Sequence, residues 1–566
     1  MGATRWHELD NSNRSTIPAY DFHSAGFNDL EGVNPLIDWE FMTTPQAGVS
    51  NKTKHYPRGK CLGGSSARNY MTYQRPTIGT MQKWADDVGD QSWVWEKVLP
   101  YYQRSTTFTP PDMSTRLANS TALFDASAFG DGPVQVSYAR YVNPSTSWIM
   151  NAWSEIGDPV RTEGLESGEL LGHQYLPSTI DPKTQERSSS QAYFELALGT
   201  TQLSVYTHAF VKRILFDHDK TATGVTVETS GMLYTISAKK EVVLSAGAFQ
   251  SPQLLMVSGV GPAETLKEYD IPVIQDLPGV GQGMEDNPMF GITFAVDVET
   301  TSTYLNNPTR FGGAIAEYNE HRTGFLTSCG ADAVSFEKLV NMDHLNISDK
   351  AKQAMALVPE DWPDVQFWGF NTWLGAQFGS APPDTKNYAC FLSSLIAPLS
   401  KGYVTINSSD MADAPIINPN WMTDPTDQEL AVASFQRQRE FLNTTALRSI
   451  SPDGEAYPGA DVTSYDDLLA VIQQQTSTFA HAAVTCKMGM ANDSMAVVDS
   501  KARVFGVRNL RVVDISAMPF LPPGQPQATA YMLGEKLADE ILYGENEAEE
   551  CAGPAGDTYL NRHTEL

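Results

Sequence analysis

The sequence predicts an α/β protein that is α+β over its whole length, and three features of its 566 residues lead to this prediction. Short alternating strands follow one another between about residues 200 and 262, and their last strand leads through a glycine turn into a helix at 241–261. A second strand and helix occupy 510–542, after an aromatic and proline-rich region at 285–480. We therefore expect strand–helix units of an α/β domain and a separate α+β region at about 285–480.

The composition excludes several classes of protein. Apolar residues make up 41% of the chain and aromatic residues 10%, which is typical of a folded protein with a large core and not of a disordered or fibrous one. The 39 basic and 67 acidic residues give a net charge of −28, which repels nucleic acid and anionic membranes. We therefore expect neither of these as a partner, and the sequence leaves the oligomeric state open.

Targeting signals and cysteines are sparse. No stretch approaches the roughly 20 apolar residues of a membrane span, and the start of the chain as written has no apolar signal region, so we expect a soluble protein. Five scattered cysteines form no metal-binding pattern, and no metal is expected. Seven glycosylation sequons are compatible with secretion if the N-terminus is truncated. They begin at Asn13, Asn51, Asn119, Asn346, Asn407, Asn443 and Asn492.

The first 105 residues combine loops, a glycine-rich block and helices. Residues 1–56 are polar and turn-rich, with one short strand at 38–41, and residues 80–105 carry Trp and Leu at helical spacing. Between them, the block at 57–71 contains two adjacent glycines followed by two serines. Such a block lets backbone N–H groups approach a pyrophosphate or a polar ring edge, although a glycine-rich turn alone is more often only a turn.

Strands dominate the next segment. The apolar run at 241–247 is typical of a strand buried on both faces, and Ser251 with Pro252 is a favourable N-cap and first residue for a helix that ends at Gly259. Before that run, we expect a small antiparallel sheet. Its strands are predicted at 203–207, 211–216, 224–227 and 232–236.

The C-terminal segment has one more strand and one more helix. A strand at 510–514 is followed by a Pro/Gly loop and by a helix at about 528–542. In that helix the apolar positions step by three or four residues. They are Ala530, Leu533, Leu537 and Ile541. Residues 543–566, with Glu545, Glu547, Glu549 and Glu550 close together, are expected to form a disordered tail.

The blocks at 57–71 and 245–261 together match both signature motifs of the glucose–methanol–choline (GMC) oxidoreductases. The resemblance continues at 277–287, 481–489 and 514–542, and the chain is identified as a member of this family. The amino-acid sequence at 522–529 is most similar to that of fungal aryl-alcohol oxidase and secondary-metabolism dehydrogenase members. The resemblance implies a domain division: 1–290 cofactor-binding, 291–480 substrate-binding, 481–542 a return to the cofactor domain with the catalytic loop, and 543–566 the tail.

The resemblance implies an FAD-dependent enzyme that oxidises a primary or secondary alcohol by hydride transfer to flavin N5. The expected substrate and partner is a small aryl or polyketide-derived alcohol of fungal secondary metabolism. His481 matches the catalytic histidine of the family, and an imidazole with a pKa near 6.5 accepts a proton around neutral pH. Gln525 stands where family members usually carry His or Asn. Its amide can hydrogen-bond the substrate oxygen but cannot take up its proton.

The resemblance also implies which residues bind FAD. The glycine-rich block lies along the flavin, a strand near the adenine supplies a backbone contact, and the last helix directs its positive N-terminus at the flavin N1/C2=O edge. The residues are Arg58, Gly63, Gly64, Ser65, Asn69, Tyr70, Met71, Thr72, Val211 at the adenine, Asp514, Gln525 and Pro526.

The resemblance further implies a doubly wound FAD-binding domain and an α+β substrate domain with an antiparallel sheet. Besides Gln525, two departures from this family pattern keep alternatives open. Ala482 and Val484 replace the usual Pro and Gly beside His481, which would shift its loop. The doubly wound domain also lacks its first βαβ unit, because the chain has no Gly-x-Gly-x-x-Gly turn and the glycines at 279–283 are spaced differently. We favour an upstream segment missing from the gene model, which would also carry any signal peptide, over a loss of tight flavin binding. In either case we expect the chain as written to bind FAD weakly or not at all.

Two other functions fit the same residues. The first is a non-redox cyclase or lyase of the same fold that uses His481 as its acid and base. The second is an inactive remnant that lacks FAD.

Overall fold

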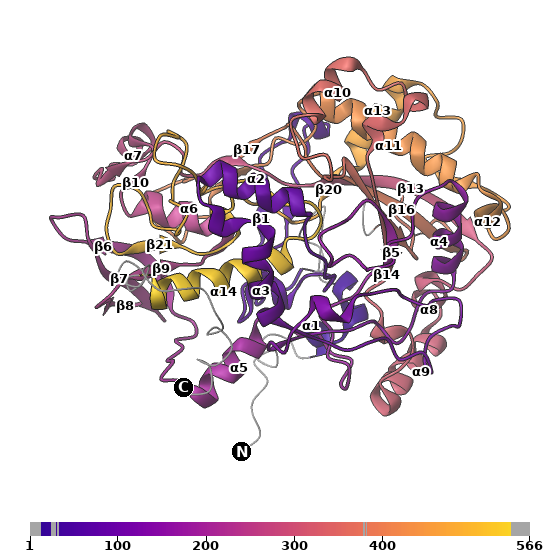
Figure 1. Cartoon of the computed structure of the whole chain (residues 1–566), viewed down its shortest axis with the longest axis horizontal. Coiled ribbons are helices and arrows are strands. Elements are labelled where there is room, and N and C mark those ends of the chain that lie inside the picture. Colours follow the sequence, from indigo (N-terminus) through magenta and orange to yellow (C-terminus); the bar gives the residue numbers. More distant parts are fainter. Residues whose placement is uncertain (1–12, 24–29, 31–32, 377–379, 381, 545–566) are drawn as a thin grey trace, which may run out of the picture.

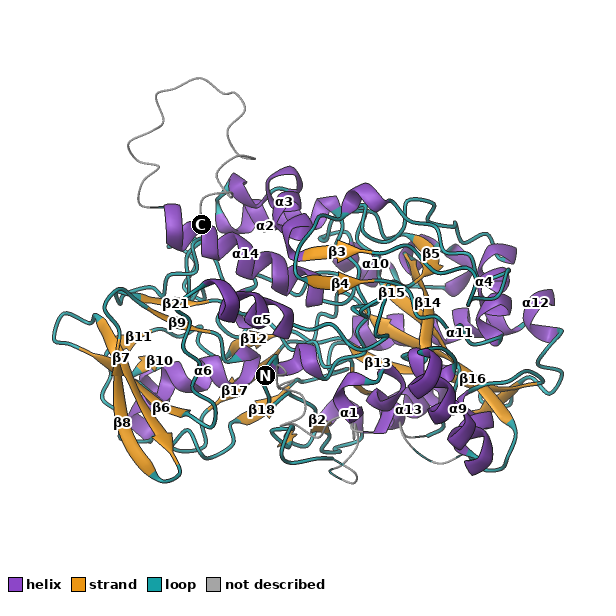
Figure 2. Cartoon of the chain, turned by 90° about the horizontal axis from the view of Figure 1, so that it is seen from below, coloured by secondary structure: helices purple, strands orange, loops and turns teal. Residues whose placement is uncertain are grey.

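The computed structural model describes residues 13–23, 30, 33–376, 380 and 382–544. Its fold is mixed α/β, as predicted, and it has two regions. One region is built on a large antiparallel sheet, and the other contains the small sheets near strands β6 to β9 and the long helix α14 (Figure 1). Figure 2 shows the β6–β8 sheet and the large sheet toward opposite ends of the molecule.

The large sheet has seven strands in the order β19-β13-β16-β15-β14-β5, with β20 also paired to β13. All of its pairings are antiparallel. The strands are β5 (Gly172–Tyr175), β13 (Pro288–Val296), β14 (Ala331–Glu337), β15 (Val365–Phe370), β16 (Asn387–Leu395), β19 (Glu455–Tyr457) and β20 (Ser477–Thr478).

Both faces of this sheet are buried, so its central strands β13 and β15 are buried along their whole length and carry apolar residues on both faces. On one face Phe367 and Phe391 pack against Phe441 of helix α11 (Pro425–Leu442), with ring centroids 4.9 and 5.1 Å apart. On the other face Trp368 lies directly opposite Leu392 of the next strand. This second face borders the cavity described below.

The predicted antiparallel meander is confirmed for three of its four strands. They are β6 (Phe210–Phe216), β7 (Ala222–Thr229) and β8 (Met232–Ser237). The strand predicted at 203–207 is wrong, because these residues form no strand. The described chain provides no neighbouring strand for this segment, and its alternating residues, Leu203 and Val205 among them, remain exposed.

The parallel part of the predicted doubly wound domain is a pair of strands from distant parts of the sequence. Strand β9 (Val242–Leu244) lies parallel to β21 (Leu510–Val512). The prediction that β9 is buried on both faces is wrong. Successive side chains of a strand point to opposite faces, and here Leu244 is buried while Val243 is 43% exposed, so one face of β9 is open to solvent.

Helix α6 (Gly247–Val257) begins four residues before the predicted N-cap, Ser251. Pro252 therefore lies inside the helix, where it cannot donate to the carbonyl of Ala248. The hydroxyl of Thr485 donates to that carbonyl instead, at 2.6 Å, so the early start leaves no unpaired oxygen. Ser251 does not cap the helix, and its hydroxyl donates to a carboxylate described below.

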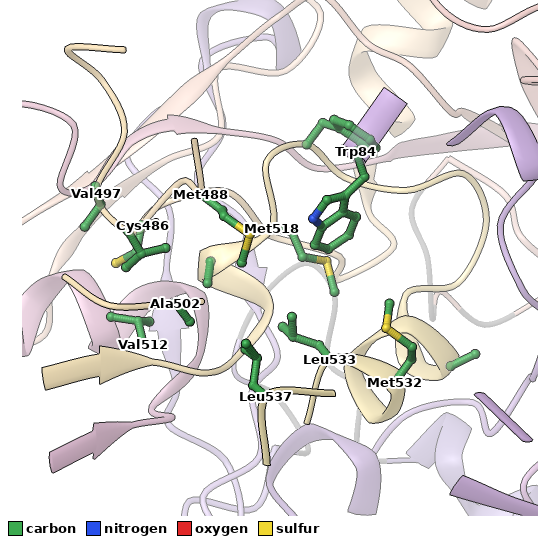
Figure 3. Packing of buried hydrophobic residues seen from close by; sticks show 14 of the residues in the cluster. Trp84, Cys486, Met488, Val497, Ala502, Val512, Met518, Met532, Leu533 and Leu537 are labelled. Atoms are coloured by element: carbon green, nitrogen blue, oxygen red, sulfur yellow. The ribbon is translucent and has the colours of Figure 1, made fainter. Parts of the chain in front are cut away.

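Helix α14 (Gln527–Tyr543) confirms the helix predicted at the C-terminal end. It packs against α3 (Trp95–Ser105) and, with α2 (Ile78–Val88), encloses an apolar core. Figure 3 shows Leu533 and Leu537 of α14 in this core near Trp84. Ile541, at the end of the predicted stripe, is 37% exposed. Residues 545–566 of the predicted disordered tail lie outside the described residues.

The structure also contains the following shorter elements. Short strands are β1 (Phe41–Met42), β2 (His55–Tyr56), β3 (Thr106–Phe108), β4 (Val134–Val136), β10 (Val260–Gly261), β11 (Gln275–Asp276), β12 (Gln282–Met284), β17 (Gly402–Thr405) and β18 (Ile416–Asn418). Further helices are α1 (Asn13–Thr16), α4 (Ser145–Glu155), α5 (Gln191–Thr200), α7 (Ala263–Glu268), α8 (Thr301–Leu305), α9 (Pro308–His321), α10 (Asp349–Met355), α12 (Thr445–Arg448) and α13 (Tyr465–Gln475). Within the described residues, no helix has the length and apolar character that a membrane crossing requires.

Candidate active site

A cavity of about 1420 Å³ lies between the glycine-rich block, the start of α6, the end of β21, the start of α14 and one face of the large sheet. Pockets for small molecules usually measure about 300–1,000 Å³, so this cavity has room for a cofactor and a substrate together. Most of the predicted site residues line it. They are Arg58, Gly63, Gly64, Ser65, Asn69, Tyr70, Met71, Thr72, His481, Asp514, Gln525 and Pro526.

Val211 is the predicted site residue that does not line this cavity. It lies in β6, where it pairs with Val227 of β7. The structure contains the protein chain alone. The FAD contacts of the twelve residues predicted to bind it therefore stay predictions.

His481 is held at the cavity wall by the two residues before β13. Its backbone N–H donates to Asp286 Oδ1 at 3.0 Å, and its ring Nδ1 lies 2.8 Å from Asn287 Oδ1. The Asn287 amide nitrogen already donates to the Leu395 carbonyl at 2.8 Å, so the amide oxygen must face the ring. Nδ1 therefore carries the hydrogen. Nε2, which no described residue hydrogen-bonds, keeps a free lone pair.

Burial and a nearby cation keep this imidazole neutral. Loss of solvent and, to a smaller extent, the positive charge of Arg58 together lower the pKa of His481 to about 3. The Arg58 guanidinium donates to the Ala480 carbonyl at 2.7 Å and lies 4.7 Å above the ring of Tyr56. Neutral imidazole is the form that accepts a proton, and Asn287 Oδ1 helps to stabilise the charged form that results.

We expect the acid limb of the kcat/KM pH profile to lie at a pH far below the usual pKa of histidine. A group with a pKa near 6.5 would lose about 90% of its neutral form at about pH 5.5. The lowered pKa of His481 keeps the neutral form fully populated there, so kcat/KM should stay level between about pH 8 and pH 5. Steady-state rates over this range measure it, with enzyme stability followed at each pH. A limb near pH 6.5 would contradict this assignment.

A buried carboxylate fixes the loop that carries His481. Asp286 accepts hydrogen bonds from the backbone of His481, from Trp421 Nε1 at 3.0 Å and from Thr478 Oγ1 at 2.6 Å. Burial raises the pKa of Asp286. Val484 adopts a φ of 76°, a left-handed conformation that is rare for a β-branched residue and that explains why the family carries Gly there.

Gln525 is fixed by two other glutamines that the sequence did not single out. Its backbone N–H donates to Gln74 Oε1 at 3.0 Å, and Gln74 Nε2 donates to the Pro523 carbonyl at 3.3 Å. Its side-chain Nε2 donates to Gln366 Oε1 at 3.1 Å. The one signal in the sequence is that Gln366 is a lone amide in the apolar strand β15.

Gly524→Ala is expected to displace Gln525. Gly524 has a φ of 85°, and an added Cβ would lie 1.9 Å from the Nε2 of Gln74. We expect a loss of about 1–2 kcal/mol in the free energy of unfolding from the left-handed backbone, and lower turnover from the shifted turn. Gly534→Ala in α14 is the matched control, since its Cβ meets no atom within 4 Å and should stabilise the helix by roughly 0.5–1 kcal/mol. Equal stability of the two variants would contradict the prediction.

The cavity wall fits the flavin end of FAD. Gly64 and Gly247 both have a positive φ, and a Cβ at either would meet no atom within 4 Å, so bare backbone borders open space. Tyr531 Oη and Gln525 Oε1 are buried on the lining without a hydrogen-bond partner in the described chain. Asp514 fixes the start of α6, because its carboxylate accepts from Gly247 N at 2.9 Å. The described residues contain no cluster of His, Cys, Asp or Glu that could hold a metal ion.

Comparisons with known proteins agree with this geometry. The GMC oxidoreductase family matches over residues 40–289 and 398–534. Patulin synthase of Penicillium expansum is 48% identical, over 95% of this chain and 86% of that protein, and versicolorin B synthase of Aspergillus parasiticus is 42% identical, over 95% and 83%.

Solved structures with the same fold include an FAD-dependent oxidoreductase from Chaetomium thermophilum. Its TM-score is 0.84 at 29% identity, over 95% of this chain and 94% of that chain. A fungal aryl-alcohol oxidase has a TM-score of 0.79 at 26% identity, over 92% and 93%. The predicted resemblance to fungal secondary-metabolism members is confirmed, and the chain belongs to the GMC oxidoreductase family.

Proposed function

We propose that this chain is an FAD-dependent alcohol oxidoreductase that converts a primary or secondary alcohol of fungal secondary metabolism, aryl or polyketide-derived, to its carbonyl. One observation carries the proposal. His481, whose Nε2 has no hydrogen-bond partner among the described residues, lines the same cavity as the glycine-rich backbone at 57–71. The names of the relatives, two synthases and an aryl-alcohol oxidase, support a small oxygenated substrate.

Each part of the site has a separate task in this proposal. His481 Nε2 accepts the hydroxyl proton, and Asn287 holds the ring in the tautomer that can do so. The block at 57–72 and the positive N-terminus of α14 hold the cofactor. Bound there, FAD supplies the acceptor for the hydride that leaves the alcohol carbon. Phe479, whose ring centroid lies 5.5 Å from that of His481, helps to exclude water from the base.

Anaerobic mixing tests the proposal. Protein reconstituted with FAD is mixed with a panel of benzylic and polyketide-type alcohols. We expect the visible flavin absorbance to bleach, with one carbonyl product formed for each flavin reduced. Protein without added FAD is the control for background conversion. No bleaching with any alcohol, in protein that has taken up FAD, would contradict the proposal.

Gln525 favours a second candidate, a non-redox cyclase or lyase. An amide at this position cannot share base work with His481, whereas a single histidine is sufficient to move one proton within a substrate. The same anaerobic experiment separates the two functions. Conversion of substrate to an isomeric or cleaved product, with no electron acceptor and no flavin bleaching, would support the cyclase or lyase.

A further inference from the structure

One row of side chains on β15 faces the cavity side of the large sheet. Residues two apart on a strand share a face, so Gln366, Trp368 and Phe370 stand in one row. The Trp368 and Phe370 rings stack with centroids 5.5 Å apart, and both line the cavity. The row is therefore an aromatic floor with an amide at one end. That amide contacts Gln525.

The two amides leave one donor and one acceptor unpaired. Gln525 Nε2 donates to Gln366 Oε1, while Gln525 Oε1 and Gln366 Nε2 have no hydrogen-bond partner among the described residues. Both side chains are more than nine-tenths buried, at 6% and 0% exposure. Buried polar groups are rarely left unpaired in native proteins, so these atoms point to a bound molecule. Gln525 lines the cavity and is the one within reach of that molecule.

The Gln366–Gln525 pair has two equivalent hydrogen-bonding arrangements. If both side-chain amides rotate by about 180°, so that each oxygen and nitrogen exchange places, Gln366 Nε2 donates to Gln525 Oε1 and the single mutual hydrogen bond is kept. Gln525 then presents N–H to the cavity in place of its oxygen. No other hydrogen bond of either side-chain amide within the described chain opposes the turn. Gln438, on the opposite face of the sheet, differs because its amide both donates to Ser393 and accepts from Ile292 N.

We propose that Gln366 is a positioning residue that turns the Gln525 N–H toward the oxygen whose proton His481 accepts. An alcohol that gives its proton to His481 keeps lone pairs on oxygen, and the carbonyl product has only acceptors, so both need a donor from Gln525. Gln366 supplies this arrangement by donating to Gln525 Oε1. The inference rests on the proposed function and adds the residue that sets the orientation of the Gln525 amide.

Gln366→Glu tests the proposal, because an ionised carboxylate accepts only. This carboxylate forces the Gln525 Nε2 to donate to residue 366, so that Gln525 Oε1 faces the cavity. At about pH 8 we expect 4-methoxybenzaldehyde to bind the FAD-reconstituted variant about tenfold more weakly than wild type, by calorimetry. Burial raises the pKa of a carboxyl group, and once protonated it donates again, so binding should recover toward about pH 5. Wild type should show no such pH dependence.

Three controls separate this role from a structural one. Gln366→Met removes both hydrogen-bonding groups and should weaken aldehyde binding at every pH. Gln438→Glu changes a buried amide of helix α11, on the opposite face of the same sheet, and should leave aldehyde binding as in wild type. 4-Methylanisole, which lacks the carbonyl, should bind wild type and Gln366→Glu equally. Its weaker binding by the variant would mean a collapsed cavity and would count against the proposal.

The outcomes for this inference and for the proposed function are distinguishable. Aldehyde affinity that is equal in wild type and Gln366→Glu at both pH values, or no aldehyde binding to wild type, would overturn the role of Gln366. A pH-dependent affinity in Gln366→Glu without flavin bleaching by any alcohol would instead support the oxygen-binding pair and contradict the proposed oxidation.

Discussion

His481→Ala is expected to lower turnover by at least about 10²-fold, the usual contribution of a positioned general base. The variant removes the free Nε2, and no other described histidine lines the cavity. The backbone N–H of residue 481 would still donate to Asp286, so the loop should keep its position. We expect little change in the flavin content or in the melting temperature. Stopped-flow flavin reduction measures the rate of the chemical step directly.

Two further measurements control this result. His481→Gln keeps a polar side chain of similar reach but cannot accept the proton, so its rate should be close to that of His481→Ala. Added imidazole should restore part of the rate in His481→Ala, because the removed ring leaves space in the cavity wall. Near-normal rates in either variant would remove His481 from the mechanism.

Much of the site could be predicted from the sequence because its parts carry local signatures. The glycine-rich block at 57–71, the strand end at Asp514 and the helix start at Pro526 all face one cavity, as the motifs implied. The supporting residues could not be predicted in the same way. Gln366 and Gln525 are 159 positions apart, and only the pairing of β15 with its neighbours brings the amide near the turn. No local pattern encodes such a contact.

The errors in the fold have a related cause. Ser251-Pro252 has the residue types of a helix start, yet the helix begins at Gly247 because Thr485 satisfies the carbonyl that Pro252 leaves free. The apolar run containing Val243 predicted burial on both faces, but burial depends on what packs against each face, and the face of Val243 is exposed. The periodicity of a segment indicates which secondary structure and burial that segment favours. The residues that pack against the segment decide whether the folded protein adopts them.

Asn287→Leu is expected to lower kcat because it removes the group that orients the His481 ring. The Asn287 amide fixes the hydrogen on Nδ1 because its own N–H group is held by the Leu395 and Ile396 carbonyls. Without that acceptor the ring populates the other tautomer and other orientations. We expect kcat to fall by about 10- to 10²-fold, as for the loss of other groups that orient a catalytic residue, with little change in KM. Steady-state kinetics on the folded fraction measures it.

Asn287→Asp distinguishes this positioning role from a merely structural one. A carboxylate beside Nδ1 stabilises the imidazolium form, so the pKa of His481 should rise from about 3 toward the ordinary value of histidine. The neutral base is then lost at a higher pH than in wild type, and the acid limb of kcat/KM should move upward. Asn287→Leu should retain a level profile at its lower rate. If both variants only lose stability, with wild-type kcat and an unmoved pH profile in the folded fraction, Asn287 does not position the base.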